Sequence, residues 1–324
     1  MKYRLTENTV EYQGKTLYQI ESLRDFSFYR KGAWEHSVKE GELGGWIEKE
    51  ENLSQQGNCW IAENVYVFGS AKVEHNAIIT GKGIIHGNAR VFGRAWIYCE
   101  NHYKFDISDQ VKIYGDAFIC DVNLTMKDNA KIYGDAEVNG YYSSLSMSNN
   151  AIFCGGKTNS SENGCISLRD NAEVRGGWLN NSCSVYGNAI IYGGGIHDNA
   201  EIYGNAKIYD SDICGEAKVE GNTEVKFDTN IGSNAYLCGN AIVERDEDVM
   251  TFSNIGTLAL LQNEEIEDMK HLTFFRASDK MQMTIGNRFY DDPEKFLQHT
   301  KLFCQNLQAM LEMAEQRFGY SEKF

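Results

Sequence analysis

The chain has 324 residues, of which 42% are hydrophobic and 24% charged, a balance typical of globular proteins and not of disordered ones. The formal net charge of −15 disfavours direct binding to nucleic acid or to an anionic membrane, since both require clustered cations. No apolar run approaches the length of a membrane span, and nine cysteines without CxxC spacing favour a reducing cytoplasm, without a zinc site.

Residues 1–58 are expected to form an N-terminal β cap. Residues 9–22 alternate around Gly14 and predict a β-hairpin. The segment GELGGWIEKEENLSQQGNCW follows, and we expect its Leu43, Trp46 and Ile47 to plug the first turn of a repeat that begins at Cys59. Such a cap protects an open sheet edge from aggregation.

From Cys59 to residue 246 the chain falls into six-residue units of the form small–x–(Ile/Val)–x–Gly–Asn. Positions 1 and 3 are two residues apart, so both point inward in a strand, whereas positions 2 and 4 point outward. The Gly–Asn or Gly–Asp pair supplies the positive φ angles that a tight corner requires. Three units close one coil, and residues 59–246 therefore predict a parallel β-helix of about ten coils.

Several segments depart from this period. Residues 101–110, 141–150 and 157–171 interrupt the repeat, and we expect them to bulge from corners as loops. The two successive coils 183–199 and 200–216 are each one residue short.

The outward positions can be sorted by face, because every third unit stacks on the same one. The third face is charged and carries Lys72, Glu74, Arg90 and Phe92. Exposed apolar patches of the size seen on the other two faces need cover. Three interpretations of these patches remain open: cover by residues 1–50 or the C-terminal domain, a homo-oligomer interface, or a groove for a partner or a ligand. The candidate binding residues on the two apolar faces are Trp60, Ile78, Trp96 and Tyr98, and Tyr66, Phe68 and Ile84.

Tyrosine recurs at position 4 in the later coils. Tyr186 and Tyr203 should stack in adjacent coils, as should Tyr192 and Tyr209. A stabilising aromatic ladder is the first interpretation. A platform on which a carbohydrate or a base stacks is the alternative.

Residues 247–324 predict a small α+β domain. HLTFFRA and MQMTIGNRF alternate around residues 278–280 and indicate a hairpin. Asp292 as N-cap and Pro293 at the first helical position then predict a helix that runs to about Phe318. Its apolar face should pack on the hairpin, and comprises Phe296, Leu297, Phe303, Leu307, Met310, Leu311 and Ala314. The charged run 264–270 should be solvated.

The segments GGWI and NLSQQGNCWI, with the repeats that follow, resemble the YdcK-type proteins, which are bacterial and phage-borne β-helix proteins often described as transferases. The resemblance covers residues 1–245 and implies a single-stranded left-handed parallel β-helix. The C-terminal domain, residues 247–324, resembles a module appended to such repeats in phage and prophage proteins.

Hexapeptide acyltransferases use a histidine as general base at a subunit interface. The candidates here are His75, His86, His102 and His197, and none lies in a recognisable catalytic motif. His86 and His102, close to Asp106, are the catalytic candidates of this chain.

We therefore expect a non-catalytic, cytoplasmic β-solenoid that recognises a macromolecular partner, such as a phage-encoded inhibitor of a host defence protein, with neither cofactor nor metal. The alternative is a hexapeptide-type acyl- or nucleotide-sugar transferase.

Overall fold

The computed structural model describes residues 1–30, 34–140, 143–160, 164–232, 234–245, 249–253, 271–277, 280–285, 288–294 and 304–318. It divides into two compact units, Met1–Asn181 and Ser182–Phe324, called here the N-terminal and the C-terminal unit. Parallel strands stack coil upon coil within each unit, which confirms the predicted mainly-β solenoid. The handedness of the coils stays a prediction. Among the described residues, no helix is long and apolar enough to cross a membrane.

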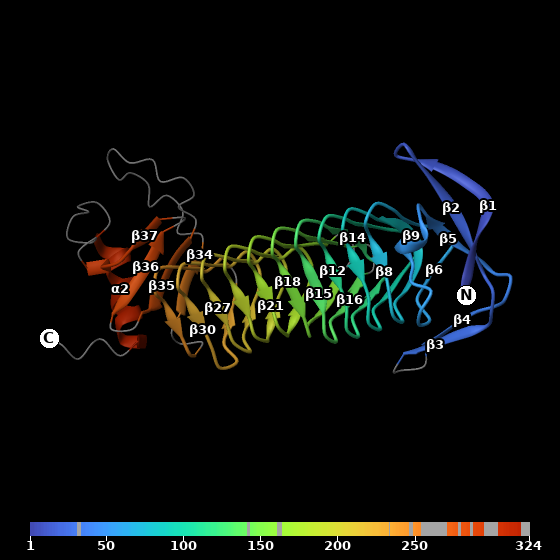
Figure 1. The fold of residues 1–324 in the computed structure, drawn as a ribbon. Coiled ribbons are helices and arrows are strands. Elements are labelled where there is room, and N and C mark those ends of the chain that lie inside the picture. The colour runs from blue at the N-terminus through green and yellow to red at the C-terminus, as the bar shows by residue number, and fades with distance from the viewer. Residues whose placement is uncertain are drawn as a thin grey trace. The chain divides into compact units, whose positions relative to one another are not determined.

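The N-terminal unit opens with a β cap (Figure 1). Its first two strands form an antiparallel hairpin whose turn residues, Gln13 and Gly14, both have positive φ, as a tight two-residue turn requires. The predicted hairpin is thus confirmed, although its first strand begins earlier than expected. The elements are β1 (Tyr3–Tyr12), β2 (Lys15–Ser22), β3 (Phe26–Arg30), β4 (Trp34–Val38), β5 (Leu43–Ile47) and the 3-10 turn η1 (Glu50–Asn52).

The residues that close the first coil differ in part from the predicted plug. Ile47 is fully buried, but Leu43 is 46% exposed and does not plug the coil, because β5 continues the antiparallel sheet of β2 there. Lys2 is buried instead, and its ammonium donates to the carbonyl oxygens of Ser54 and Cys59, both at 2.6 Å. Burial lowers the pKa of Lys2. The buried ammonium is thus itself satisfied by two carbonyl oxygens where the first coil begins.

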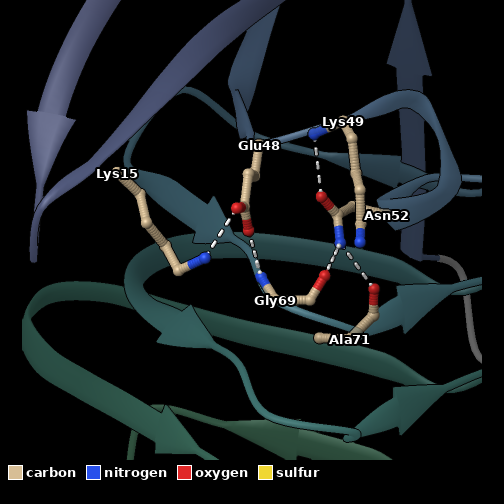
Figure 2. Close-up of polar contacts among 6 residues, drawn as sticks. All are labelled: Lys15, Glu48, Lys49, Asn52, Gly69 and Ala71. Carbon is tan, nitrogen blue, oxygen red and sulfur yellow. Dashed lines mark hydrogen bonds and ion pairs between the residues drawn. The ribbon is translucent and has the colours of Figure 1, made fainter.

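A second polar cluster joins the cap to the first coils (Figure 2). Glu48 accepts from the Lys15 ammonium and from the Gly69 amide, both at 2.6 Å. The hydrogen bond from Lys15 lowers the pKa of Glu48. Asn52 is fully buried, and its Nδ2 donates to the carbonyl oxygens of Gly69 at 3.2 Å and Ala71 at 2.8 Å. These bonds fix the cap against the corner at residues 69–71.

The coils of the N-terminal unit present three faces, A, B and C. Face A contains β6 (Trp60–Ile61), β9 (Ile78–Ile85), β11 (Trp96–Ile107), β13 (Phe118–Cys120), β16 (Glu137–Gly140), β19 (Lys157–Ser160) and β22 (Trp178–Leu179). Face B contains β7 (Val65–Val67), the second halves of β9 and β11, β14 (Asn123–Met126), β17 (Ser144–Met147) and β20 (Cys165–Leu168). Face C contains β8 (Lys72–Val73), β10 (Arg90–Val91), β12 (Lys112–Ile113), β15 (Lys131–Tyr133), β18 (Ile152–Cys154) and β21 (Glu173–Val174).

The interior follows the predicted pattern of small and branched residues. On face C, for example, Ala71 and Val73 are both fully buried, whereas Lys72 between them is exposed. Inward side chains of neighbouring coils also complement each other in size. Phe105 takes the place of a small residue, and Gly83 lies beneath it, where a Cβ would stand 2.3 Å from the Phe105 ring.

The irregular segments are shorter than predicted. Residues 104–107 were expected to belong to a loop, yet they pair in register with β9 as part of the continuous strand β11. Only residues 100–103 are inserted there, as a bulge between Cys99 and Lys104. Residues 144–147 and 165–168 likewise pair in register within face B, and residues 157–160 within face A, so the loop prediction is wrong for these three segments. The pairing tolerates insertions at corners because the strands on either side keep their own hydrogen bonds.

The C-terminal unit repeats the same coil. Its strands are β23 (Ser184–Val185), β24 (Ile190–Ile191), β25 (Gly195–Ile196), β26 (Glu201–Ile202), β27 (Lys207–Ile208), β28 (Asp212–Ile213), β29 (Lys218–Val219), β30 (Glu224–Val225), β31 (Asn230–Ile231), β32 (Tyr236–Leu237) and β33 (Ile242–Val243). Val185 pairs with Ile202 and Ile202 with Val219, so these two successive coils contain the same number of residues. The next coil, from Val219 to Leu237, contains one residue more. The two shortened coils are thus confirmed.

A small sheet with a helix completes the C-terminal unit. Its elements are β34 (Val249–Ser253), β35 (His271–Arg276), β36 (Met281–Ile285), β37 (Arg288–Tyr290) and α2 (Cys304–Phe318). β35 and β36 form the predicted hairpin, and Leu311, Ala314 and Phe318 of α2 pack on it. The predicted helical residues 295–303 and the charged run 264–270 lie outside the described residues. Thr284 donates to the carbonyl of Tyr236, so this sheet covers the end of the last coil.

Candidate functional site

The apolar residues predicted on face A point outward but are covered. Trp60 is 1% exposed, and its ring meets that of Phe26 from β3 edge-on at 5.6 Å. Ile78 and Trp96 are also buried, with Trp96 edge-on to Phe118 at 6.3 Å. Of the predicted binding residues on this face, Tyr98 alone keeps partial exposure.

Face B is covered in a similar way where it meets the cap. Tyr12, near the tip of the β1–β2 hairpin, lies 4.9 Å from the ring of Tyr66 and 5.8 Å from that of Phe68. Phe68 is 4% exposed, whereas Tyr66 and Ile84 are half-buried. Contacts with the N-terminal residues, one of the alternatives considered from the sequence, therefore cover Trp60, Tyr66 and Phe68. Tyr66, Ile84 and Tyr98 keep partial exposure.

A cleft of about 510 Å³ lies at the corner where β9 and β11 pass from face A to face B. It is lined by Tyr98, by Glu63 and Lys82, and by His36 from β4. Burial lowers the pKa of His36, so its imidazole is neutral near pH 7, and its Nε2 has no partner among the described residues. Burial also raises the pKa of Cys99 to about 11, which leaves the thiol protonated and weakly nucleophilic. The cleft can hold a small polar ligand, and Cys99, the thiol among its described lining residues, is not activated.

The two candidate catalytic histidines are placed differently. Nε2 of His86 lies 3.2 Å from Oδ1 of Asp106, and Phe68 stacks on the imidazole at 5.2 Å. A carboxylate in this position orients an imidazole as in general-base catalysis. His102 is exposed in the four-residue bulge, and no contact joins it to this pair within the described part of the chain. The structure thus brings His86 and Asp106 together, as predicted, but leaves His102 apart from them.

The predicted tyrosine ladders of the C-terminal unit are confirmed as stacks. The rings of Tyr186 and Tyr203 are 4.8 Å apart and those of Tyr192 and Tyr209 are 4.6 Å apart, each pair within 4° of parallel. Each ring covers one face of its neighbour, so half of the flat ring surface of each pair is used in the stack. This geometry favours the stabilising ladder over a platform on which sugars or bases stack.

Face C carries a charged surface that the sequence reasoning identified only in its first two coils. Four cations occupy position 2 of four successive coils, each directly paired with the next across the parallel strands, and are called here the cation column: Lys72, Arg90, Lys112 and Lys131. Arg90 forms an ion pair with Glu74 at 2.5 Å. For the three lysines, no carboxylate lies within ion-pair distance in the described parts of the chain. Lys72 and Lys112 are exposed.

Aromatic rings stand beside these cations at position 4 and form the aromatic column: Phe92, Tyr114 and Tyr133. Neighbouring rings are stacked at 4.9 Å, and the guanidinium of Arg90 lies 5.1 Å above Phe92. A hydrogen bond with Cys154, together with burial, raises the pKa of Tyr133 to about 12. Its phenol is therefore neutral and adds no negative charge to the surface. Across the described residues, no group of three His, Cys, Asp or Glu side chains is arranged to hold a metal.

The lysines of the later coils were missed because residues 101–110 disturb the count of units. The signal is nevertheless present in the sequence, since the triplets AKV, ARV, VKI and AKI each begin the third unit of a coil. Once the four-residue bulge and the single extra residue between Ile119 and Met126 are removed from the count, Lys112 and Lys131 fall in line with Lys72 and Arg90.

Comparison with known proteins shows a distant and partial similarity. The chain matches no protein-family model. A segment of 105 residues, 30% of the chain, is 33% identical to the protein named "Uncharacterized acetyltransferase YdcK" from Escherichia coli (strain K12). The match spans 29% of the length of that relative, so the similarity is partial on both sides.

Proposed function

We propose that this protein is a non-catalytic solenoid that recognises a partner protein through the cation and aromatic columns of face C. The cation column is the observation that supports this function. Like charges placed directly opposite each other on neighbouring strands destabilise a sheet, and salt bridges could have relieved that cost. In a chain with a net charge of −15, three of these cations have no carboxylate partner among the described residues. An acidic partner would neutralise them.

The make-up of the surface favours a protein over a nucleic acid. The column holds four cations on an otherwise acidic molecule, whereas nucleic-acid binding draws most of its affinity from many phosphate contacts. The adjacent half-buried aromatic rings supply the amphipathic contact area typical of protein interfaces, in which aromatic residues and arginine are enriched.

Charge reversal on face C tests this function. The unmodified protein is used to capture its partner from a bacterial lysate. We expect the double variant Lys112→Glu/Lys131→Glu to capture at least about tenfold less of that partner. The matched control is Lys104→Glu/Lys127→Glu, which makes the same change of charge on face B of nearby coils and should capture normally. Equal capture by the face C variant, or no specific capture by the unmodified protein, would contradict the proposal.

A second candidate function is acyl transfer, favoured by the contact between His86 and Asp106 and by the name of the Escherichia coli relative, which calls it an acetyltransferase. Under this alternative, His86 would act as general base on an acceptor. We expect instead that His86→Ala and His102→Ala each leave partner capture unchanged and lower the melting temperature by at most about 4 °C, as loss of one exposed contact implies. Loss of function in a variant that melts normally would overturn this prediction and favour the transferase.

A further inference from the structure

The cation column has a repeat set by the strand spacing of a β-sheet. Lys72, Arg90, Lys112 and Lys131 are direct Cα partners across four neighbouring strands. Neighbouring strands lie about 4.8 Å apart, so the column repeats at that interval and spans roughly 14 Å. A partner that engages all four cations must present anions at a similar interval.

The regular forms of a polypeptide differ in how well they match this interval. Residues spaced alternately by three and four along an α-helix lie on one stripe, with a rise of about 5 Å per step and roughly 15 Å over four carboxylates. In an extended strand, side chains on one side are about 6.7 Å apart, which gives roughly 20 Å over four. The difference in length between the helical stripe and the cation column is small enough for flexible lysine side chains to bridge. In an extended strand, the fourth carboxylate would lie more than one coil spacing beyond the fourth cation.

The aromatic column adds a second stripe parallel to the first. Position 4 is two residues along the strand from position 2, so the two columns lie about 7 Å apart. Phe92 and Tyr114 in this column are half-buried and stacked at 4.9 Å. A helix whose acidic stripe lies on the cations would set the neighbouring stripe of its surface over these rings, and apolar residues suit that position.

The ends of the column limit the length of the occupant. After Lys131, the next partners along face C are Ile152 and then Glu173, which is ion-paired with Arg175 at 2.8 Å. A carboxylate that extended beyond the fourth cation would first meet an apolar side chain and then another carboxylate. The acidic stripe that fits therefore contains four carboxylates, spaced three or four residues apart over about three helical turns.

We propose that the occupant of face C is an acidic amphipathic α-helix of the partner protein, lying across the strands along the direction in which the coils stack. This inference rests on the proposed function and adds to it the conformation and charge pattern of the partner segment. It also separates the contribution of charge alone from that of spacing. Any acidic chain would neutralise the lysines, but of the two single-chain conformations compared above the helix is the one that matches their interval.

The test compares two synthetic helical peptides of equal composition by fluorescence anisotropy. One carries Glu at positions 1, 4, 8 and 11 of its helix with leucines beside them, in the spacing of about 5 Å per step derived above. In the other, the same four glutamates are distributed around the helix. We expect the aligned peptide to bind at least about tenfold more tightly, and Lys112→Glu/Lys131→Glu to abolish the difference. The control Lys104→Glu/Lys127→Glu should leave it unchanged.

The outcomes distinguish this inference from the proposed function. If both peptides bind equally and both depend on Lys112 and Lys131, face C recognises acidic chains without regard to spacing, and only the helix inference fails. If a single-stranded oligonucleotide binds more tightly than either peptide, the occupant is a nucleic acid and both proposals fail. If neither peptide binds although lysate capture depends on Lys112 and Lys131, the helix inference fails and the proposed function stands.

Discussion

Ile191→Asp is expected to unfold the coils around β24, with a loss of roughly 3–5 kcal/mol, the usual cost of an uncompensated buried charge. Ile191 is fully buried and points into the solenoid, where no described residue offers a cation to a carboxylate. Lost burial of the isoleucine side chain adds about 2 kcal/mol. In a solenoid each coil contacts only its neighbours, so the damage should be local. Hydrogen exchange in β24 and β27 should become fast, with a lower melting temperature. Ile202→Asp in β26 should behave alike.

The neighbouring residue supplies the control. Ile190 lies on the same strand, points outward and pairs with Lys207, so Ile190→Asp introduces the same carboxylate beside a cation at the surface. Its effect on stability should be within about 1 kcal/mol, as for most exposed substitutions. Equal melting temperatures for Ile190→Asp and Ile191→Asp would contradict the inward assignment of position 3.

The regular part of the fold could be predicted because one period fixes both the backbone and the direction of each side chain. Ile191 and Val219 were assigned to the interior from their place in the unit, and both are fully buried. Corners follow from the same units, since Gly204 and Gly221 have φ angles near +70° that only glycine adopts at no steric cost. The shortened coils were visible for the same reason, because a missing residue shifts every later unit.

Contacts between coils could not be predicted from the period. Phe105 breaks the rule for a small residue, so residues 101–110 were assigned to a loop. The structure accommodates the ring because Gly83 beneath it leaves the space that a Cβ would occupy. That compensation joins residues far apart in sequence, and no local pattern records it. The same lost register concealed Lys112 and Lys131, and with them half of the cation column.

The sequence also did not predict which residues cover the apolar faces. The outward direction of Trp60 and Tyr66 was predicted correctly, and the need for cover followed from their size. Which segment supplies it depends on how the cap folds back: Phe26 meets Trp60, and Tyr12 meets Tyr66. Neither cap residue belongs to a periodic pattern that points to its contact. The candidate surface accordingly moves from the apolar faces to face C.

Asn52→Asp is expected to destabilise the N-terminal unit by roughly 3–5 kcal/mol at pH 7, although the two side chains have the same shape. The Nδ2 of Asn52 donates to the carbonyl oxygens of Gly69 and Ala71 from a fully buried position (Figure 2). In the variant, a carboxylate oxygen would face these two acceptors. Both hydrogen bonds would be lost, and the buried charge would keep only the Lys49 backbone amide, which donates to Oδ1 of residue 52 at 3.0 Å, as a donor among the bonds drawn in Figure 2. The loss detaches the cap from the corner it holds.

The pH dependence identifies the cause. Burial beside two carbonyl groups raises the folded-state pKa of the new carboxyl above its unfolded value of about 3.9. The folded variant then binds more protons than the unfolded one between these two pKa values, so its stability falls as pH rises through that window. The gap in melting temperature between variant and unmodified protein should therefore narrow from pH 7 towards pH 4.5. Asn64→Asp, at an exposed corner, is the control and should show little gap at either pH. A gap for Asn52→Asp that does not change with pH would point to altered packing instead of a buried charge.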